Sequence, residues 1–404
     1  MKKLGFKEYL FIIPTVVLIG IFSLWPVLQS FTYTFFDYRL NDQQKAGLYM
    51  SERFNVELFH ETQTYLTMFL EEDKEQVTDP ALQQKIDQLI RKIEKTAEAY
   101  EGKKGVQKIS KEEKENLVAL SKEAKQVVKE MSDKYDTTNE ENLPLIVEDI
   151  DKSIISSNFI GLKGYKQALT DARLGKALWN TTVFTFISVF LELVLGLALA
   201  LIMNKAIKGQ GWIRTTSLIP WAIPTAVAAL MWSYLYDGSS GIIANIFEKI
   251  GLVENSRELL MSETGAMVSA ILADVWKTTP YMALLLLAGL QNISRSTYEA
   301  AEIDGANAVQ KFFRITLPLL KPSILVALLF RTLDAFRVFD LIYVLTGGGP
   351  GGATETLSIY GYKTMFAQTN FGYGSVIVMI MFVSVAIIAA IYVKILGANL
   401  MDKN

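Results

Sequence analysis

Six long apolar runs constrain the fold of this chain more than any other feature of its sequence. Each run is at least as long as the roughly 20 residues that an α-helix needs to cross about 30 Å of hydrocarbon. Because a helix satisfies its own backbone hydrogen bonds inside a bilayer, we expect an all-α polytopic membrane protein with six transmembrane helices. The six runs are 9–36, 177–203, 215–236, 265–290, 323–346 and 373–396.

A long polar block separates the first apolar run from the second. The chain has 404 residues, of which 50% are hydrophobic and 20% are charged. This mixture is typical of membrane spans joined to one polar domain. We therefore divide the chain into an N-terminal end with the first span (1–39), a polar insert (40–157) and a core of five spans (158–404). The insert is mildly acidic and the remainder mildly basic, and neither balance indicates nucleic-acid binding.

Apolar residues recur at helical spacing in three stretches of the insert. Capping signals precede two of them, because Asp79 stands before Pro80 and Ser110 forms a capping box with Glu113. The pattern predicts an α-helical module that contains an antiparallel hairpin; a solvated, partly disordered spacer is the alternative. The three stripes are Phe54, Leu58, Tyr65 and Phe69; Leu82, Ile86, Leu89, Ile93 and Tyr100; and Leu117, Leu120, Ala124, Val127, Met131 and Tyr135.

The sequence lacks the residues that many enzymatic and metal sites need. Cysteine is absent and His60 is the single histidine, so the chain offers no disulfide, no thiolate nucleophile and no multi-histidine metal cluster. It also has no G-x-x-x-x-G-K-[ST] motif to cradle the phosphates of ATP. We expect a protein that is not an enzyme, that holds no metal or cofactor, and that takes its energy from another subunit or from a gradient.

Basic residues gather in alternate loops between the apolar runs. Because basic flanks stay in the cytoplasm, this bias predicts that both termini and the loop 291–322 are cytoplasmic and that the insert is extracytoplasmic. The lysines of the insert do not oppose this, since long domains cross a membrane largely regardless of charge. Residues near the predicted inner ends are Lys205, Lys208, Arg214, Arg295, Lys311, Arg314, Lys321 and Lys394, whereas Lys249, Arg257 and Lys363 lie in the outer loops.

The fifth apolar run carries charged residues at every third position. On one helix they would spiral across half of the surface, with aromatic residues between them. Charges at membrane depth normally face a protein interior or a wet cavity, so we predict a solute path suited to a neutral, hydroxyl-rich solute. Ion pairs that only brace the helices are the alternative, and both can hold. The predicted residues are Arg331, Asp334, Arg337 and Asp340, with Phe336, Phe339 and Tyr343.

The loop before this run is amphipathic. Its residues 298–322 contain two helical patterns on either side of Gly305, and a glycine in that position indicates a break between two short helices. In the second pattern Phe312, Ile315 and Leu319 fall at helical spacing, which predicts a packed face. A folded helix-turn-helix between two membrane spans can dock a partner.

This stretch resembles the EAA loop of the permease subunits of bacterial ATP-binding-cassette (ABC) importers. That pattern is E-A-A, three residues, a glycine, and then about nine residues before I-x-L-P. The run FRTLDAFRVFDLIYVLTGGGP is similar to permeases for maltose, trehalose and related sugars. The matching residues of the loop are Glu299, Ala300, Ala301, Gly305, Ile315, Leu317 and Pro318, and Asp304 belongs to a D-G-A sequence typical of sugar importers.

The resemblance implies a type I importer fold and a set of partners. A solute-binding protein outside the cell would deliver a di- or oligosaccharide to a heterodimer of this chain and a second permease in the lipid membrane. Two cytoplasmic ATPase subunits would drive transport. Glu299 would anchor the loop on an ATPase, Gly305 would allow its bend, and the other matching residues would complete the coupling element. The insert would contact the binding protein.

Two other classes of function remain as alternatives. A gradient-driven secondary sugar carrier predicts internal repeats and transport by this chain alone, and the sequence shows no clear repeat. A receptor predicts a sizeable cytoplasmic output domain, whereas only a short tail follows residue 396.

Overall fold

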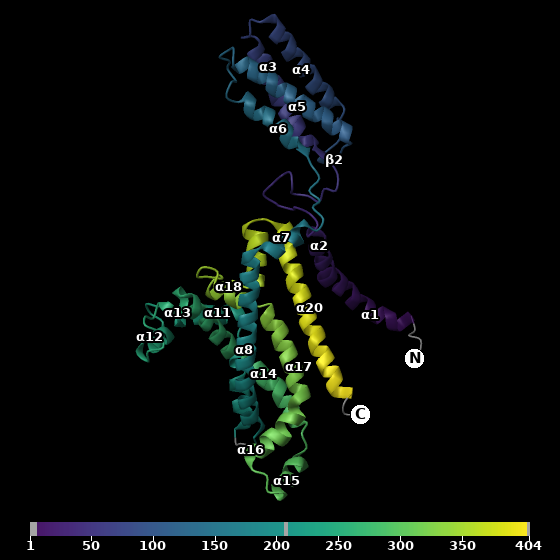
Figure 1. The fold of residues 1–404 in the computed structure, drawn as a ribbon. Helices are drawn as coiled ribbons and strands as arrows, with labels where there is room; N and C mark the ends of the chain where they lie inside the picture. The colour runs from purple at the N-terminus through teal and green to yellow at the C-terminus, as the bar shows by residue number, and fades with distance from the viewer. Residues whose placement is uncertain (1–5, 206–208, 402–404) are drawn as a thin grey trace. The chain divides into compact units, whose positions relative to one another are not determined.

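The computed structural model describes residues 6–205 and 209–401, and side chains from residue 12 to residue 396 within those ranges. The chain forms two compact units (Figure 1). One comprises the residues up to Tyr165 together with Gln368–Tyr373, and the other comprises Lys166–Ala367 and the residues from Gly374 onward.

The first unit begins with an apolar helix and continues into the insert. The apolar helix consists of α1 (Phe6–Ile19), a π-helical turn η1 (Gly20–Leu24) and α2 (Trp25–Tyr33). The insert has four helices and one small antiparallel sheet in the order β2-β1-β3. Its elements are β1 (Arg53–Asn55), α3 (Val56–Lys74), α4 (Pro80–Glu98), β2 (Val106–Lys108), α5 (Lys111–Ser132), α6 (Leu143–Ser153) and β3 (Ile154–Ile155).

The insert is a folded domain with its own apolar core, which excludes the disordered-spacer alternative. The Asp79 side chain accepts a hydrogen bond from the Ala81 amide at the start of α4. Ser110 and Glu113 form the predicted reciprocal capping box of α5, so both capping predictions are confirmed. The sheet and α6 were not predicted. Core residues that are almost fully buried include Phe54, Phe59, Leu66, Leu70, Leu82, Ile86, Leu89, Ile93, Ala124 and Met131.

The first predicted stripe of the insert was wrong in phase. Phe54 lies in strand β1, and the side chain of Asn55 caps α3 at the next residue, so the helix begins only at Val56. Its buried face includes Phe59, Leu66 and Leu70, while Tyr65 is exposed. A stripe counted from a strand residue cannot keep the helical phase.

This phase gives a prediction for two neighbouring residues. We expect Leu66→Ala to lower the free energy of unfolding of the insert by about 2–5 kcal/mol, because Leu66 is fully buried and the smaller side chain leaves a cavity. Tyr65→Ala, on the exposed face, should change it by less than about 0.5 kcal/mol. Urea unfolding of a polypeptide of residues 50–157, followed by circular dichroism, measures both; equal losses would contradict this helix phase.

The second unit is almost entirely helical. Helices α8 and α14 form its centre and α17 packs against both of them. Helix α7 (Lys163–Thr170) leads into it from the first unit. The elements are α8 (Ala172–Asn204), α9 (Gln210–Ser217), α10 (Ile219–Ala222), α11 (Thr225–Leu235), α12 (Ile242–Lys249), α13 (Glu258–Met261), α14 (Glu263–Gln291), α15 (Arg295–Ile303), α16 (Ala308–Lys311), η2 (Phe312–Thr316), α17 (Leu317–Phe336), α18 (Asp340–Leu345), α19 (Leu357–Tyr362), η3 (Lys363–Ala367) and α20 (Phe371–Met401).

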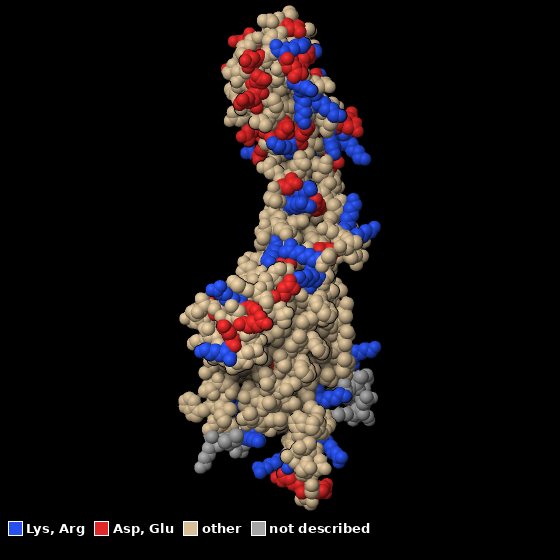
Figure 2. Space-filling view, turned by 60° about the vertical axis from the view of Figure 1, so that its left-hand side comes forward, with Lys and Arg blue, Asp and Glu red and all other residues tan. Residues whose placement is uncertain are grey.

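Among the described residues, five helices are long and apolar enough to cross a membrane. A sixth candidate is a bent pair, Gln210–Ala222 with Thr225–Leu235, whose two parts meet at 88°. The bend lies at Ile223 and Pro224. Proline has no backbone N–H to continue the helix, and it keeps the preceding residue extended. Figure 2 shows a broad uncharged surface over the spans of this unit, as a surface in contact with hydrocarbon requires.

The predicted fifth span needs a correction. Helix α17 ends at Phe336 and the chain turns before α18 begins at Asp340. Arg331 and Asp334 therefore lie on one helix, whereas Arg337 and Asp340 lie beyond its end. The four charges do not spiral along a single continuous helix, although their spacing of three residues had indicated one.

Candidate functional site

A charged cavity of about 290 Å³ lies where α14, α17 and the bent pair meet. Most of the residues predicted for a solute path line it. Phe336 does not, because it faces a separate apolar groove, and Tyr343 stacks behind Phe339 with a ring distance of 5.2 Å. The predicted residues that line the cavity are Arg331, Asp334, Arg337, Phe339 and Asp340, joined by Trp221, Asp274 and Lys277.

Arg331 is the centre of a buried ion-pair network. Its guanidinium is 1% exposed and donates to Glu192 at 2.6 Å, to Asp274 at 3.0 Å and to Asp334 at 2.8 Å. Thr278 donates a further hydrogen bond of 2.6 Å to Glu192. The carboxylates come from α8, α14 and α17, so Arg331 ties three helices together. For this residue the bracing alternative accounts for its contacts.

Lys277 holds the break in the bent pair. Its ammonium donates to the backbone carbonyls of Trp221 at 3.2 Å and Ile223 at 2.9 Å, the carbonyls left without helix partners where α10 ends. One turn further along α14, Tyr281 stacks on Trp221 with a ring distance of 5.4 Å. Helix α14 thus fixes the bend of a neighbouring span beside the cavity.

An aromatic cluster extends the cavity wall. Phe339 contacts Tyr343 and Tyr362, and Tyr362 also contacts Phe366, with ring centroids about 5 Å apart throughout. Tyr343 is exposed, so part of the cluster is open to a ligand. Such rings can stack on the apolar faces of sugars as well as on each other.

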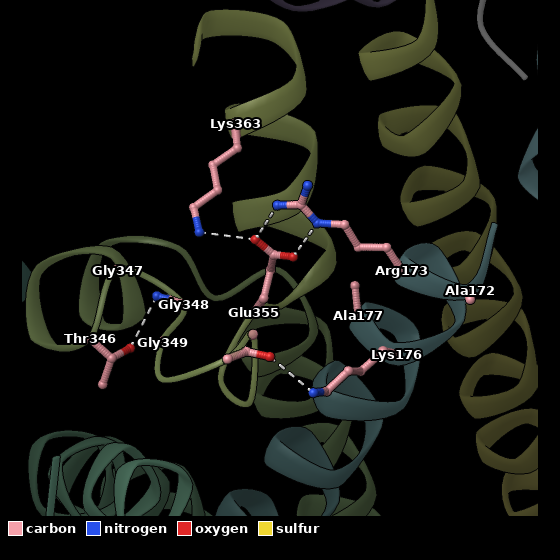
Figure 3. Close-up of a pocket in the computed structure, with 12 residues that line it drawn as sticks. Ala172, Arg173, Lys176, Ala177, Thr346, Gly347, Gly348, Gly349, Glu355 and Lys363 are labelled. Atoms are coloured by element: carbon pink, nitrogen blue, oxygen red, sulfur yellow. Dashed lines mark hydrogen bonds and ion pairs between the residues drawn. The ribbon is translucent and has the colours of Figure 1, made fainter. Parts of the chain in front are cut away.

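A second pocket, of about 690 Å³, lies at the start of α8 beside the glycine loop Gly347–Gly352 (Figure 3). Glu355 accepts hydrogen bonds from Arg173 at 2.7 and 2.9 Å and from Lys363 at 3.0 Å. Burial alone would raise the pKa of Glu355, but these hydrogen bonds lower it below its ordinary value. The pocket wall is therefore ionised at neutral pH.

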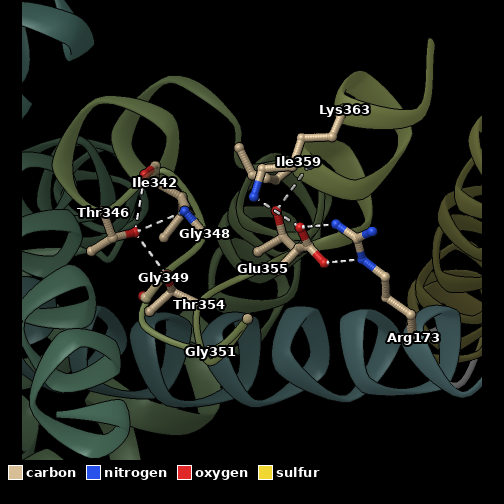
Figure 4. Close-up of polar contacts among 12 residues, drawn as sticks. Arg173, Ile342, Thr346, Gly348, Gly349, Gly351, Thr354, Glu355, Ile359 and Lys363 are labelled. Atoms are coloured by element: carbon tan, nitrogen blue, oxygen red, sulfur yellow. Dashed lines mark hydrogen bonds and ion pairs between the residues drawn. The ribbon is translucent and has the colours of Figure 1, made fainter. Parts of the chain in front are cut away.

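The glycine loop closes on itself through hydroxyl groups (Figure 4). Thr346 and Thr354 share a hydrogen bond of 2.7 Å, and Thr354 donates to the carbonyl of Gly349 at 2.7 Å. Gly348 has a φ of 88°, in the left-handed region that favours glycine. The glycines thus have a structural role in the tight turn that follows α18.

The loop 291–322 forms a compact helical hairpin at the end of α8 opposite the glycine loop (Figure 1). Gly305 has a φ of 81° and follows α15, and the Ala306 amide donates to the carbonyl of Ala301 at 2.8 Å. This is the glycine-ended helix that the sequence predicts. Tyr298 and Thr316 share a hydrogen bond of 3.0 Å that ties the two arms of the hairpin together.

The predicted packed face of the second arm holds only in part, because Phe312 and Ile315 are half-buried but Leu319 is exposed. A π-helical turn, η2, inserts one extra residue per turn, so Thr316 and Leu320 are buried and Leu319 is exposed. Three apolar side chains of the hairpin also face solvent, with Ile303 87% exposed and Val309 and Phe313 more than half exposed. Glu299 is exposed and lies 3.3 Å from Arg295. The surface of the hairpin is thus apolar and charged together.

Comparison with known proteins decides the family. Residues 192–401 match the family of binding-protein-dependent transport system inner membrane components. The chain belongs to this family. The matched range contains the bent pair, the charged cavity and the helical hairpin.

Several characterised relatives are similar to this permease. It is 46% identical over 237 residues to the trehalose/maltose transport system permease protein MalF of Thermococcus litoralis, which covers 59% of this chain and 79% of that protein. It is 45% identical over 240 residues to the trehalose transport system permease protein SugA of Mycobacterium tuberculosis, covering 59% and 76%. The sulfoquinovosyl glycerol transport system permease protein SmoG of Agrobacterium fabrum is 39% identical over 242 residues, covering 60% and 78%.

A solved structure supports the fold of the permease. A bacterial ABC transporter involved in the import of the acidic polysaccharide alginate matches with a TM-score of 0.54 at 22% identity, over 59% of this chain and 84% of that chain. The expected importer-permease fold and the all-α class are confirmed. The relatives are transport permeases, and among the described residues no group of three His, Asp or Glu side chains is placed to hold a metal ion.

Sequence reasoning missed several residues in and around the charged cavity. Glu192 is the single charge of one apolar run, Asp274 shares another run with Lys277, and nothing in their spacing joins them to Arg331. Tyr362 lies beyond the glycine loop and joins Phe339 only through the fold. An available signal was Lys277, a buried cation in an apolar run, because such a cation requires acceptors within the protein.

The glycine-loop pocket of the permease gives a prediction. We expect Glu355→Gln to speed amide exchange in residues 347–355 by about 10- to 150-fold, because hydrogen bonds to a charged group contribute about 1.5–3 kcal/mol. Since the pKa of Glu355 is lowered in the folded protein, its contribution is complete at neutral pH and is lost as the pH falls below the ordinary glutamate pKa through the lowered value. Hydrogen-exchange mass spectrometry measures this. Exposed Glu263→Gln is the control, and equal exchange in the two variants would contradict the prediction.

Proposed function

We propose that this permease forms the solute path of an ATP-driven importer for a di- or oligosaccharide. The observation that carries the proposal is the presence of two separate sites in the second unit: a charged, aromatic-walled cavity among the spans, and a folded hairpin with exposed apolar side chains at one end of α8. The cavity can bind a solute, and the hairpin can receive force from another protein.

The hairpin is proposed to couple ATP hydrolysis to transport. Exposed Ile303, Val309 and Phe313 would insert into a cleft of a separate ATPase subunit, since apolar side chains surrounded by charges are typical of binding surfaces. Exposed Glu299 would pair with a basic side chain of that subunit. Gly305 would set the angle between the arms. The proposed coupling residues are Glu299, Ala300, Ala301, Asp304, Gly305, Ile315, Leu317 and Pro318.

The cavity is proposed to bind the sugar. Asp334, Arg337 and Asp340 line it without full burial, so their charged groups can exchange hydrogen bonds with hydroxyls, while Phe339 offers a ring beside them. Relatives named for trehalose, maltose and sulfoquinovosyl glycerol support a glycoside as the solute. Arg331 is a positioning residue in this proposal, because its guanidinium is already bonded to carboxylates.

The remaining partners and the orientation belong to the same proposal. The permease would pair with a second permease in the cell membrane, carry two ATPase subunits on its cytoplasmic side and receive the sugar from a solute-binding protein outside. Both termini would be cytoplasmic. The division into 1–39, 40–157 and 158–404 would separate the first span, an extracytoplasmic insert that contacts the binding protein, and the transport core.

Sugar-stimulated ATP hydrolysis tests the proposal. The purified complex of both permeases and the ATPases, with the binding protein, should hydrolyse ATP several-fold faster with its own sugar in a panel of mono-, di- and oligosaccharides. Stimulation by amino acids or ions but by no sugar would overturn the substrate class. Sugar uptake by this chain alone along an ion gradient would favour the secondary-carrier alternative.

A further inference from the structure

The insert presents an exposed apolar patch on the face formed by α3 and α6, two helices that pack side by side. On α3, Tyr65 is 49% exposed and Met68 is similarly open. On α6, Leu145 is 63% exposed. The Tyr65 ring contacts Phe69 at 6.4 Å, and Phe69 packs against the core, so the patch rests on a rigid base. Exposed large apolar side chains on a polar domain mark an interaction site.

Uncompensated carboxylates surround this patch. Along the opposite seam, between α4 and α5, Lys85 pairs with Glu130 and Lys92 pairs with Glu123. Figure 2 shows carboxylates gathered along one side of the insert. On α6, Asp149 pairs with Lys152 and Asp151 pairs with Lys125, but five other exposed carboxylates on or next to α3 and α6 join no ion pair among the described residues, and no group there is placed to hold a metal. These carboxylates are Glu61, Glu71, Glu75, Glu141 and Glu148, and with Tyr65, Met68 and Leu145 they make up what we call the acidic face.

We propose that the acidic face docks a basic surface of the solute-binding protein. The inference rests on the proposed function and specifies which surface of the insert makes contact and what its partner must offer. A second copy of the acidic face, or an anionic lipid surface, would be repelled by the same carboxylates. A lysine-rich protein surface complements them, speeds encounter and can cover the patch. Tyr65 and Met68 then supply the buried centre of the contact and the carboxylates its rim.

Charge reversal in the intact complex tests this docking. The test variant carries Glu61→Lys, Glu71→Lys and Glu148→Lys, and the matched control carries Glu94→Lys, Glu98→Lys and Glu115→Lys, three exposed carboxylates of α4 and α5. The readout is the concentration of sugar-loaded binding protein that gives half-maximal ATPase activity in lipid nanodiscs. We expect at least a tenfold increase for the test variant at low salt, an increase below threefold for the control, and unchanged activity at saturation.

Salt dependence and a neutral variant separate docking from misfolding. The tenfold increase should shrink to about twofold or less at 0.5 M salt, because exposed charges are then screened within about 4 Å. Tyr65→Ala with Met68→Ala should weaken half-saturation at both salt concentrations, since the loss is apolar.

Each other outcome overturns the inference in a distinct way. Equal shifts in the test and control variants, or none, would remove the acidic face and leave the proposed function intact. A wild-type complex that the binding protein does not stimulate would overturn both. Self-association of the wild-type complex that the test variant abolishes would assign the acidic face to a second copy of this chain instead.

Discussion

Replacing Arg331 with methionine is expected to destabilise the permease by about 3–5 kcal/mol and to abolish transport. Methionine fills a similar volume, but Glu192 and Asp274 would then lie buried without the guanidinium that now donates to both. Removing one partner of a buried ion pair costs this much because the other charge remains without water or a counter-charge. The apparent unfolding temperature of the purified complex should fall by roughly 10 °C.

A matched variant and a rescue sharpen this prediction. Arg337→Met removes an arginine three residues from Asp334 that is two-thirds exposed, and it should leave the unfolding temperature nearly unchanged. Adding Glu192→Gln to Arg331→Met removes one of the stranded charges and should recover part of the loss. If Arg331→Met and Arg337→Met unfold at the same temperature, the network does not brace the helices.

Gly305→Pro and Glu299→Lys are each expected to reduce sugar uptake at least tenfold while the complex still assembles. Proline fixes φ near −65°, whereas Gly305 has a φ of 81°, and it also removes the amide that donates to the carbonyl of Glu302 at 3.0 Å. The second arm of the hairpin would therefore leave its present direction. Glu299→Lys reverses an exposed charge and leaves the backbone of α15 intact.

The readout is ATP-driven uptake into proteoliposomes, with subunit composition measured on the same preparation. Glu254→Lys reverses an exposed charge between α12 and α13, outside the hairpin, so it separates an effect of position from an effect of net charge and should leave uptake unchanged. Normal uptake by both Gly305→Pro and Glu299→Lys would refute a coupling role for the hairpin.

The elements that local chemistry determines could be predicted from the sequence. The caps at Asp79 and Ser110 act within a few residues, and so does the glycine end of α15. Length and apolar content likewise predicted the spans. The predicted buried faces were wrong where one residue shifted the helical phase. The strand before α3 and the π-helical turn η2 each changed which side chains are buried.

Only some residues of the charged cavity and its surroundings could be predicted from the sequence. Charges are rare in apolar runs, so the charged residues near the end of α17 could be predicted to line a solute path. Glu192 and Asp274, which pair with Arg331, lie on other helices, and Tyr362, which contacts Phe339, follows the glycine loop in the chain. Such contacts depend on helix packing, which no spacing along one chain encodes. The end of α17 at Phe336 was not predicted either.

The central claim is that a hairpin on this permease transmits the work of a separate ATPase to a solute cavity that the permease cannot power alone. The most direct test is sugar uptake into proteoliposomes that contain the two permeases with or without the ATPase subunits, with ATP on the side that the hairpin faces. The account predicts uptake only when ATPases and ATP are both present. Equal uptake without the ATPases would contradict it.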